Sequence, residues 1–137
     1  MYNLTEEIFS TVTINLNSVP QQTGDIPGLT KTLILTKPSK VIVSYTVYAL
    51  SVGCSFCSST IFNMEIFLNN ISTGRIRKTL VNASWDPVVG NRILTLAAGT
   101  HTIKIVGKNL SGPTLRLGSD SYTDYPSSMI IQVIPQN

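Results

Sequence analysis

Charged side chains are scarce in this chain. Its 137 residues include 10 Lys and Arg and 7 Asp and Glu, so that only 12% are charged, about half the share usual for a soluble domain. The net charge of +3 is small for a polyanion binder, and the one basic cluster, Arg75-Ile76-Arg77-Lys78, divides between the two faces of a strand. We therefore expect a solvated strand edge there, no nucleic-acid partner, and a surface rich in hydroxyl and amide groups.

Long apolar runs are absent as well. No stretch approaches the roughly 18 apolar residues of a membrane-spanning helix. The segment Met1–Glu7 contains acidic residues rather than the basic start and apolar core of a secretion signal. These features predict a protein made in the cytoplasm of its host, without membrane insertion, that leaves the cell by lysis or by a non-classical route.

Side chains that commonly perform catalysis are few. The single histidine, His101, follows a glycine turn, and no nucleophile-elbow sequence or glycine-rich phosphate motif accompanies it. The loop Gly118–Ser127 offers carboxylates and hydroxyls that calcium would accept, but it lacks the ligand order of an EF-hand, and turn formation explains the same residues. We expect no enzymatic activity, no cofactor and no metal, with His101 at the rim of a sheet.

Cysteine is nearly absent, and the two that occur, Cys54 and Cys57, are two residues apart. A zinc site needs three or four ligands. A thioredoxin-like redox centre lies at the start of a helix in a βαβ unit, whereas Cys54 follows a strand and a glycine. Two interpretations remain open: free, partly buried thiols, or a local disulfide formed after release into an oxidising environment.

Alternation of apolar and polar residues with a period of two dominates the rest of the chain. Turn residues, including those of Pro20–Gly28 and Asp86–Gly90, separate the alternating segments. About nine short strands at this spacing predict an antiparallel sandwich or barrel in one domain, residues 1–137. The strands are expected at Thr11–Leu16, Leu29–Thr36, Val41–Leu50, Ile61–Asn69, Arg75–Val81, Arg92–Leu96, Thr102–Ile105, Thr114–Leu117 and Ser128–Ile134.

Two of these segments have further local features. Val41–Leu50 is β-branched and aromatic along its length, which suits a central strand that is at least partly covered on both faces. Arg92–Val106 contains two alternating runs around Ala97-Ala98-Gly99-Thr100, and Gly99 can adopt the positive φ that a tight turn often needs. We predict that Arg92–Val106 forms a β-hairpin.

The order of these segments resembles a known family. The segment Leu94–Ile105, followed by a Gly/Ser/Asp-rich loop and a closing strand at Ser127–Ile134, is similar to the second half of tumour-necrosis-factor-like and complement-globular-head-like jelly rolls. Lys31–Leu50 is consistent with their first half. The resemblance implies an all-β, two-sheet antiparallel jelly-roll sandwich of about 8–10 strands, with residues 1–10 as a candidate extended N-terminal arm.

Such domains occur in viral fibres and head appendages and on bacterial surfaces, and they commonly assemble as trimers for adhesion, recognition or particle decoration. The aromatic positions near their trimer axis are only loosely matched, by Tyr45, Tyr48 and Phe67. The resemblance therefore implies assembly and binding rather than catalysis.

Aromatic residues in loops are the candidate contact residues. An exposed Trp or Tyr offers a large, rigid surface with a polar tip, which suits protein interfaces and sugar rings alike. The alternative for Trp85 is a buried position that caps the core. The candidates for partner or ligand contact are Trp85, Asp86, Tyr122, Asp124 and Tyr125.

Together these features favour a non-enzymatic structural or assembly protein of a virion, such as a head-decoration or fibre protein of a bacterial virus. The expected partners are other copies of the chain in a homotrimer, other virion proteins, and a glycan or receptor on the host surface. The alternative is a carbohydrate- or receptor-binding sandwich of an adhesin at the bacterial cell surface.

Overall fold

The computed structural model of the chain describes residues 4–10, 12–52, 59–81, 84–119 and 126–136. These residues form ten strands and no helix, so no helix among them could cross a membrane. The strands are β1 (Leu4–Phe9), β2 (Thr13–Leu16), β3 (Thr23–Leu35), β4 (Ser39–Val52), β5 (Thr60–Leu68), β6 (Ile71–Leu80), β7 (Asp86–Leu96), β8 (Gly99–Ser111), β9 (Thr114–Gly118) and β10 (Ser128–Pro135).

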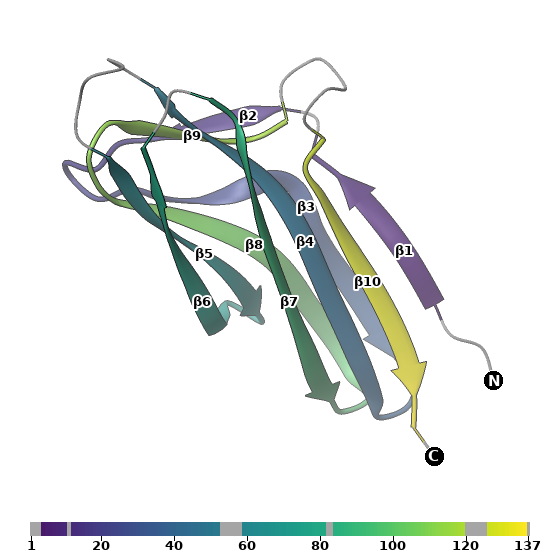
Figure 1. Cartoon of the computed structure of the whole chain (residues 1–137). Coiled ribbons are helices and arrows are strands. Elements are labelled where there is room, and N and C mark those ends of the chain that lie inside the picture. The colour runs from purple at the N-terminus through teal and green to yellow at the C-terminus, as the bar shows by residue number, and fades with distance from the viewer. Residues whose placement is uncertain (1–3, 11, 53–58, 82–83, 120–125, 137) are drawn as a thin grey trace.

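The strands form two antiparallel sheets that pack face to face (Figure 1). The six-stranded front sheet contains β1, β2, β4, β7, β9 and β10, and the four-stranded back sheet has the order β3-β8-β5-β6. In the front sheet β4 pairs with β7 on one side and, on the other, with β10 along its first part and with β9 near its end. The predicted all-β, two-sheet jelly-roll sandwich is confirmed.

The first described residues form an edge strand of the front sheet. β1, which comes from the segment expected as an N-terminal arm, pairs with β10 from Leu4 opposite Val133 to Phe9 opposite Ser128. At this edge the Glu6 carboxylate lies 2.7 Å from Lys31 Nζ of β3. The two sheets are thus linked on this side of the sandwich by an ion pair as well as by apolar contacts.

The segment Arg92–Val106 is not a hairpin, and that prediction is wrong. β7 pairs with β4 in the front sheet, whereas β8 pairs with β3 and β5 in the back sheet. Residues 97 and 98 therefore connect the two sheets. Gly99 does adopt a positive φ of 132°. Alternation around a glycine turn indicates that the chain reverses direction there. A hairpin and a connection between the two sheets both require such a reversal, so this signal does not distinguish them.

Two segments expected as turns belong to strands. Pro87 and Gly90 lie in β7, which is an edge strand, so the N–H that proline lacks is not needed by a second neighbour. In β3 the register with β8 shifts between Asp25 and Thr30, where Gly28 has a φ of 81°. This bulge turns both Ile26 and Leu29 into the core.

The core fills the space between the sheets with apolar side chains of both inward faces. Its largest fully buried members include Phe62, Met64, Ile103, Leu117 and Met129. One buried polar side chain, Asn109, forms hydrogen bonds to connecting segments at one end of this core.

Asn109 is completely buried. Its Nδ2 donates hydrogen bonds to Leu16 O at 2.9 Å and to Pro113 O at 3.0 Å. Its backbone N–H donates to Gln22 O at 3.1 Å. One amide side chain therefore joins β8 to β2 and to the turn before β9, with backbone carbonyls as its partners.

Candidate functional site

The outward side of the front sheet has few charged side chains among the described residues. Its outward positions lie side by side in register, for example Ile93, Ile42 and Gln132 in one row. We call this surface the outer front face; it consists of Phe9 of β1, Ile42, Ser44, Thr46 and Tyr48 of β4, Val89, Asn91 and Ile93 of β7, and Ser128, Ile130 and Gln132 of β10.

Several apolar side chains of the outer front face are open to solvent. The exposed fraction is 66% for Ile93, 60% for Val89 and 50% for Phe9. Among the described residues, three charged groups of this sheet border the face: Lys40 of β4, Glu7 of β1 beside Ile130, and Arg116 of β9 beside Leu50. A partner that covers the face itself would mainly displace water from apolar and uncharged polar groups.

The outward side of the back sheet has the opposite character. Lys104 Nζ lies 3.3 Å from an Asp25 carboxylate oxygen and 5.8 Å from the centre of the Phe67 ring. Arg75 and Arg77 are exposed on β6, the edge strand of this sheet. The predicted solvated strand edge is confirmed for this basic cluster, and the two outer faces of the sandwich differ strongly in charge.

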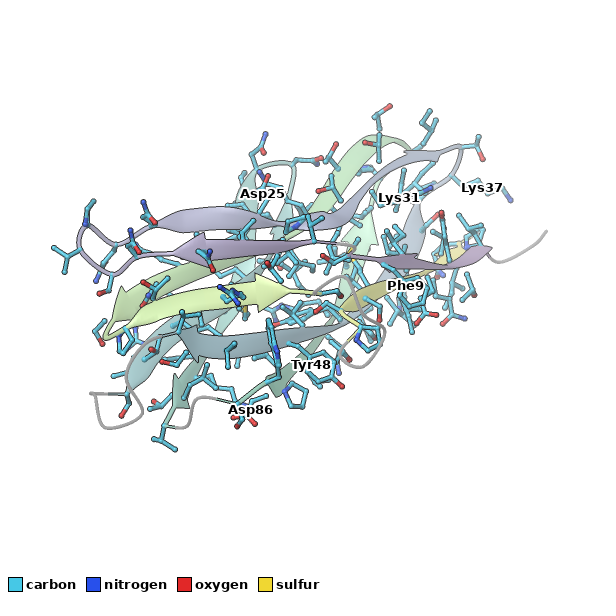
Figure 2. The ribbon with its side chains drawn as sticks, turned by 90° about the horizontal axis from the view of Figure 1, so that it is seen from above. Phe9, Asp25, Lys31, Lys37, Tyr48 and Asp86 are labelled. Atoms are coloured by element: carbon cyan, nitrogen blue, oxygen red, sulfur yellow. The ribbon has the colours of Figure 1, made fainter. Side chains whose placement is uncertain are left out.

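A groove of about 640 Å³ opens between β3 and the pair formed by β1 and β10. Its apolar lining includes Leu4, Leu33, Leu35 and Val133. Two lysines also line it, and both lie along the β3 side of the molecule (Figure 2). One of them, Lys31, forms the ion pair with Glu6 that links the sheets.

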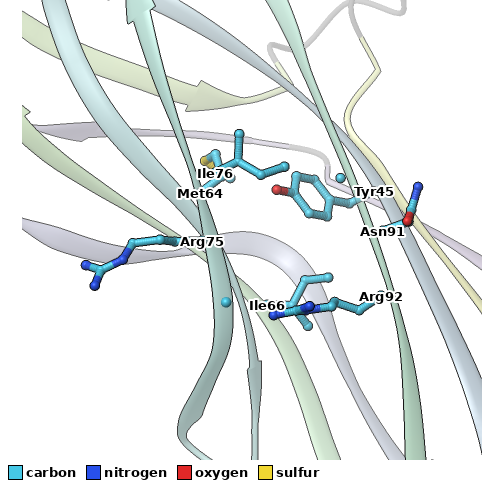
Figure 3. A pocket seen from close by; sticks show the side chains of 9 residues that line it. Tyr45, Met64, Ile66, Arg75, Ile76, Asn91 and Arg92 are labelled. Carbon is cyan, nitrogen blue, oxygen red and sulfur yellow. The ribbon is translucent and has the colours of Figure 1, made fainter.

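A smaller crevice of about 180 Å³ opens on the opposite side of the sandwich, between the edge strands β6 and β7 (Figure 3). Tyr45 of β4 points its ring into the crevice, and Arg92 of β7 extends towards β6. Burial raises the pKa of the Tyr45 hydroxyl to about 12, because removal from water disfavours the charged phenolate. The hydroxyl is therefore protonated at neutral pH.

Of the predicted contact residues, the structure describes Trp85 and Asp86. Both side chains are half-buried, and Asp86 begins β7 opposite Ala49. Figure 2 shows Asp86 near Tyr48, which is on the neighbouring strand. The remaining candidates, Tyr122, Asp124 and Tyr125, lie outside the described residues, as do Cys54 and Cys57.

The described flanks of the segment that contains the two tyrosines lie close to this region. Ser127 N donates to Ser119 Oγ at 2.6 Å, so the two ends of the segment meet. Tyr48 N in turn donates to Ser127 Oγ at 2.9 Å. The bases of both predicted contact segments therefore lie at the same end of β4, one on each side of that strand.

His101 lies near the start of β8, at the sheet rim where the sequence predicted it. Its Nε2 is 2.9 Å from Ala97 O, and its Nδ1 is 3.1 Å from Asn69 Nδ2. Among the described residues no group of three or more His, Cys, Asp or Glu side chains could hold a metal ion.

The outer front face was not identified from the sequence, although a signal for it exists. Pairs of adjacent apolar residues interrupt the alternation at Val88-Val89, Ile93-Leu94 and Ile130-Ile131. Because successive side chains of a strand point to opposite faces, each pair places one apolar residue inside and one outside. In every pair the structure buries one member and exposes the other.

The three aromatic residues compared with a trimer axis do not share a surface. Tyr45 points inward and is 3% exposed, whereas Tyr48 lies on the outer front face. Phe67 lies on the outward side of the back sheet beneath Lys104. The loose match therefore defines no interface residues.

No protein-family model and no curated protein matches the chain. A chain in the structure of infectious bursal disease virus Gx strain matches with a TM-score of 0.52 and 13% identity, over 99% of this chain and 33% of that chain. The crystal structure of the T13 IBDV viral particle gives a TM-score of 0.47 and 10% identity, over 98% of this chain and 40% of that one. A CBM36 carbohydrate-binding module in complex with calcium and xylotriose gives 0.35 and 10%, over 93% and 97%.

This chain therefore spans about a third of the length of the virus chain that it matches. At such low identity the likeness shows the fold, a jelly-roll β-sandwich. It supports the jelly-roll part of the resemblance found in the sequence and does not confirm a tumour-necrosis-factor-like family.

Proposed function

We propose that this chain is a non-enzymatic structural and assembly protein of a virion, and that its outer front face packs against other copies of the chain. The observation that carries the proposal is the scarcity of charge on and around that face, combined with the exposure of Ile93, Val89 and Phe9. A head-decoration or fibre protein of a bacterial virus that assembles as a trimer fits this surface. The match in fold to a chain of a virus structure supports the virion setting.

The outer front face is large enough to form the centre of a stable contact. From Ile42 to Tyr48 it spans seven residues of β4, which at about 3.3 Å per residue gives a length of roughly 23 Å. Four strands side by side, spaced about 4.8 Å apart, give a width of roughly 19 Å and a footprint of about 440 Å². A stable protein interface buries about 800 Å² on each partner, so the proposed contact extends beyond this face along the sheet. Exposed apolar groups over such an area favour association because burial removes them from water.

A charge introduced into the outer front face should prevent self-association. We expect Ile93→Lys to convert the assembly to a monomer at about 10 µM, because the interface would have to bury an unpaired ammonium group at a cost of several kcal/mol. Sedimentation velocity or light scattering measures the change. The fold should be retained, since Ile93 is 66% exposed in the single chain.

The matched control is Ile34→Lys on the back sheet, where Ile34 is 78% exposed. This variant makes the same chemical change on the other outer face and should assemble as the wild type does. A wild-type chain that is strictly monomeric at this concentration, and that does not bind purified particles, would contradict the proposal.

A carbohydrate- or receptor-binding sandwich of a surface adhesin is the second candidate. Trp85 and Asp86 favour it, because a half-buried Trp beside a carboxylate can stack on a sugar ring and bind its hydroxyls. We expect wild-type protein to bind a subset of a glycan array under this hypothesis, and Trp85→Ala to lose that binding while circular dichroism shows the same fold. Equal binding by both proteins, or none by the wild type, counts against it.

A further inference from the structure

The side of the sandwich between β6 and β7 is open, because each of these strands pairs with only one neighbour. Two side chains cross the opening to backbone carbonyls: Lys78 Nζ donates to Pro87 O at 3.0 Å, and the Arg92 guanidinium donates to Thr73 O. The crevice of about 180 Å³ lies at this opening, with a volume equal to about six water molecules.

Two glycines give the crevice its shape. A Cβ atom on Gly90 would lie 2.5 Å from ring atoms of Tyr45, so the ring occupies the place where a side chain of β7 would point. A Cβ atom on Gly74 would collide with the Arg92 guanidinium. The positions of Tyr45 and Arg92 therefore both depend on a missing side chain in an edge strand.

Tyr45 presents a hydroxyl group to the interior of the crevice. The residue is 3% exposed, and its hydroxyl points towards Ile76 and Met64 (Figure 3). Among the described residues this hydroxyl has no hydrogen-bond partner, and it is not sealed from solvent, since the only described buried side-chain N or O atom without a partner is Asn109 Oδ1. The hydroxyl therefore faces the water of the crevice, and a ligand that accepts its hydrogen bond would replace that water.

Arg92 supplies a positive charge at the same crevice. Its guanidinium extends from β7 towards β6 near Ile66, whereas Arg75 is directed away from the crevice (Figure 3). Within the described part of the chain Arg92 forms no ion pair, and no carboxylate lines the crevice. A guanidinium has five N–H donors, so donors remain after the bond to Thr73 O.

We propose that the crevice binds a small organic carboxylate. The Arg92 guanidinium attracts and binds the anion, the Tyr45 hydroxyl donates to one of its oxygen atoms, and Ile76 and Met64 contact its apolar part. Charge complementarity selects an anion over a neutral molecule, and the apolar wall selects an organic acid over chloride.

Titration of the folded protein with butyrate tests this site. At constant ionic strength, NMR spectra should show saturable chemical-shift changes at Gly74, Ile76 and Gly90, and sodium chloride should not produce them. Tyr45→Phe keeps the ring and should weaken binding about tenfold, because it removes one hydrogen bond to a charged group. Arg92→Gln keeps a donor for Thr73 O but removes the charge, and should weaken binding by more than tenfold.

Tyr48→Phe is the matched control, because Tyr48 lies on the same strand but on the outer front face; its affinity should equal that of the wild type. Tyr45→Phe should fold about as well as the wild type, since it keeps the ring and removes a hydroxyl that has no hydrogen-bond partner among the described residues. No saturable change with butyrate, the same change with chloride, or unchanged affinity in Tyr45→Phe would overturn the proposal. The monomeric chain contains the whole crevice, so this result does not depend on assembly through the outer front face.

Discussion

Gly90→Val is expected to lower the free energy of unfolding by about 3 kcal/mol, although valine is among the best strand formers and glycine among the poorest. A Cβ atom at this position would lie 2.5 Å from three atoms of the Tyr45 side chain, which are two ring carbons and the hydroxyl oxygen. The ring has little room to retreat because Tyr45 is 3% exposed, and β7 cannot move away without losing its pairing with β4. Thermal unfolding should show a melting temperature lower by about 10 °C.

The control for this prediction is the adjacent residue. Asn91→Val changes the next position of the same edge strand, where the side chain is exposed on the outer front face. It should change the stability by no more than about 0.5 kcal/mol. In a Tyr45→Ala background, Gly90→Val should lose most of its effect, since the two side chains compete for one space. Equal destabilisation by both valine substitutions would show that the ring contact is not the cause.

Strand positions were largely predictable because they depend on local pattern. The period-two alternation at Val41–Leu50 and Ser128–Ile134 reports which residues face the core, and β4 and β10 lie there. Strand pairing was not predictable, because it depends on distant segments. The same glycine turn at Gly99 would serve a hairpin or, as here, a passage between sheets.

Edge strands were also hard to predict, for a different reason. β1 contains Glu6 and Glu7, whose charges conceal the alternation; it forms a strand through its backbone pairing with β10, and Glu6 contacts Lys31 at the sheet edge. β7 begins with Asp86-Pro87, which is a turn signal in isolation. The charged residues of β1 and the proline of β7 are both tolerated because each of these strands has a neighbour on one side only.

The candidate site was only partly predictable from residue chemistry. Trp85 and Asp86 were identified because an aromatic residue beside a carboxylate in a loop is a recognisable local signal. Tyr45 and Arg92 lie 47 residues apart by their numbers and come together only because β4 and β7 pair at the open side of the sandwich. The significance of Gly90 depends on the same pairing, so no local sequence feature indicates it.

Asn109→Asp is expected to destabilise the protein at pH 7 by about 4 kcal/mol, the cost of a buried charge without a partner. The change replaces the amide donor with an acceptor oxygen, which would face Leu16 O at 2.9 Å and Pro113 O at 3.0 Å. Burial and the two carbonyl dipoles would raise the pKa of the new carboxyl in the folded state above its unfolded value of about 3.9. At pH 7 the folded protein must either hold this unfavourable charge or bind a proton.

The sign of the pH dependence follows from that shift. The folded state binds the proton more tightly than the unfolded state, so the penalty is fully present above the folded-state pKa and decreases as the pH falls towards the unfolded value. Below that value the neutral carboxyl can donate one hydrogen bond, to Leu16 O or to Pro113 O, and only part of the loss remains. Urea unfolding of variant and wild type between pH 4 and 8 measures the difference at each pH. Asn91→Asp, on the exposed outer front face, should show almost none. A loss in Asn109→Asp that stays constant across this range would mean that the fold does not raise the pKa of the new carboxyl.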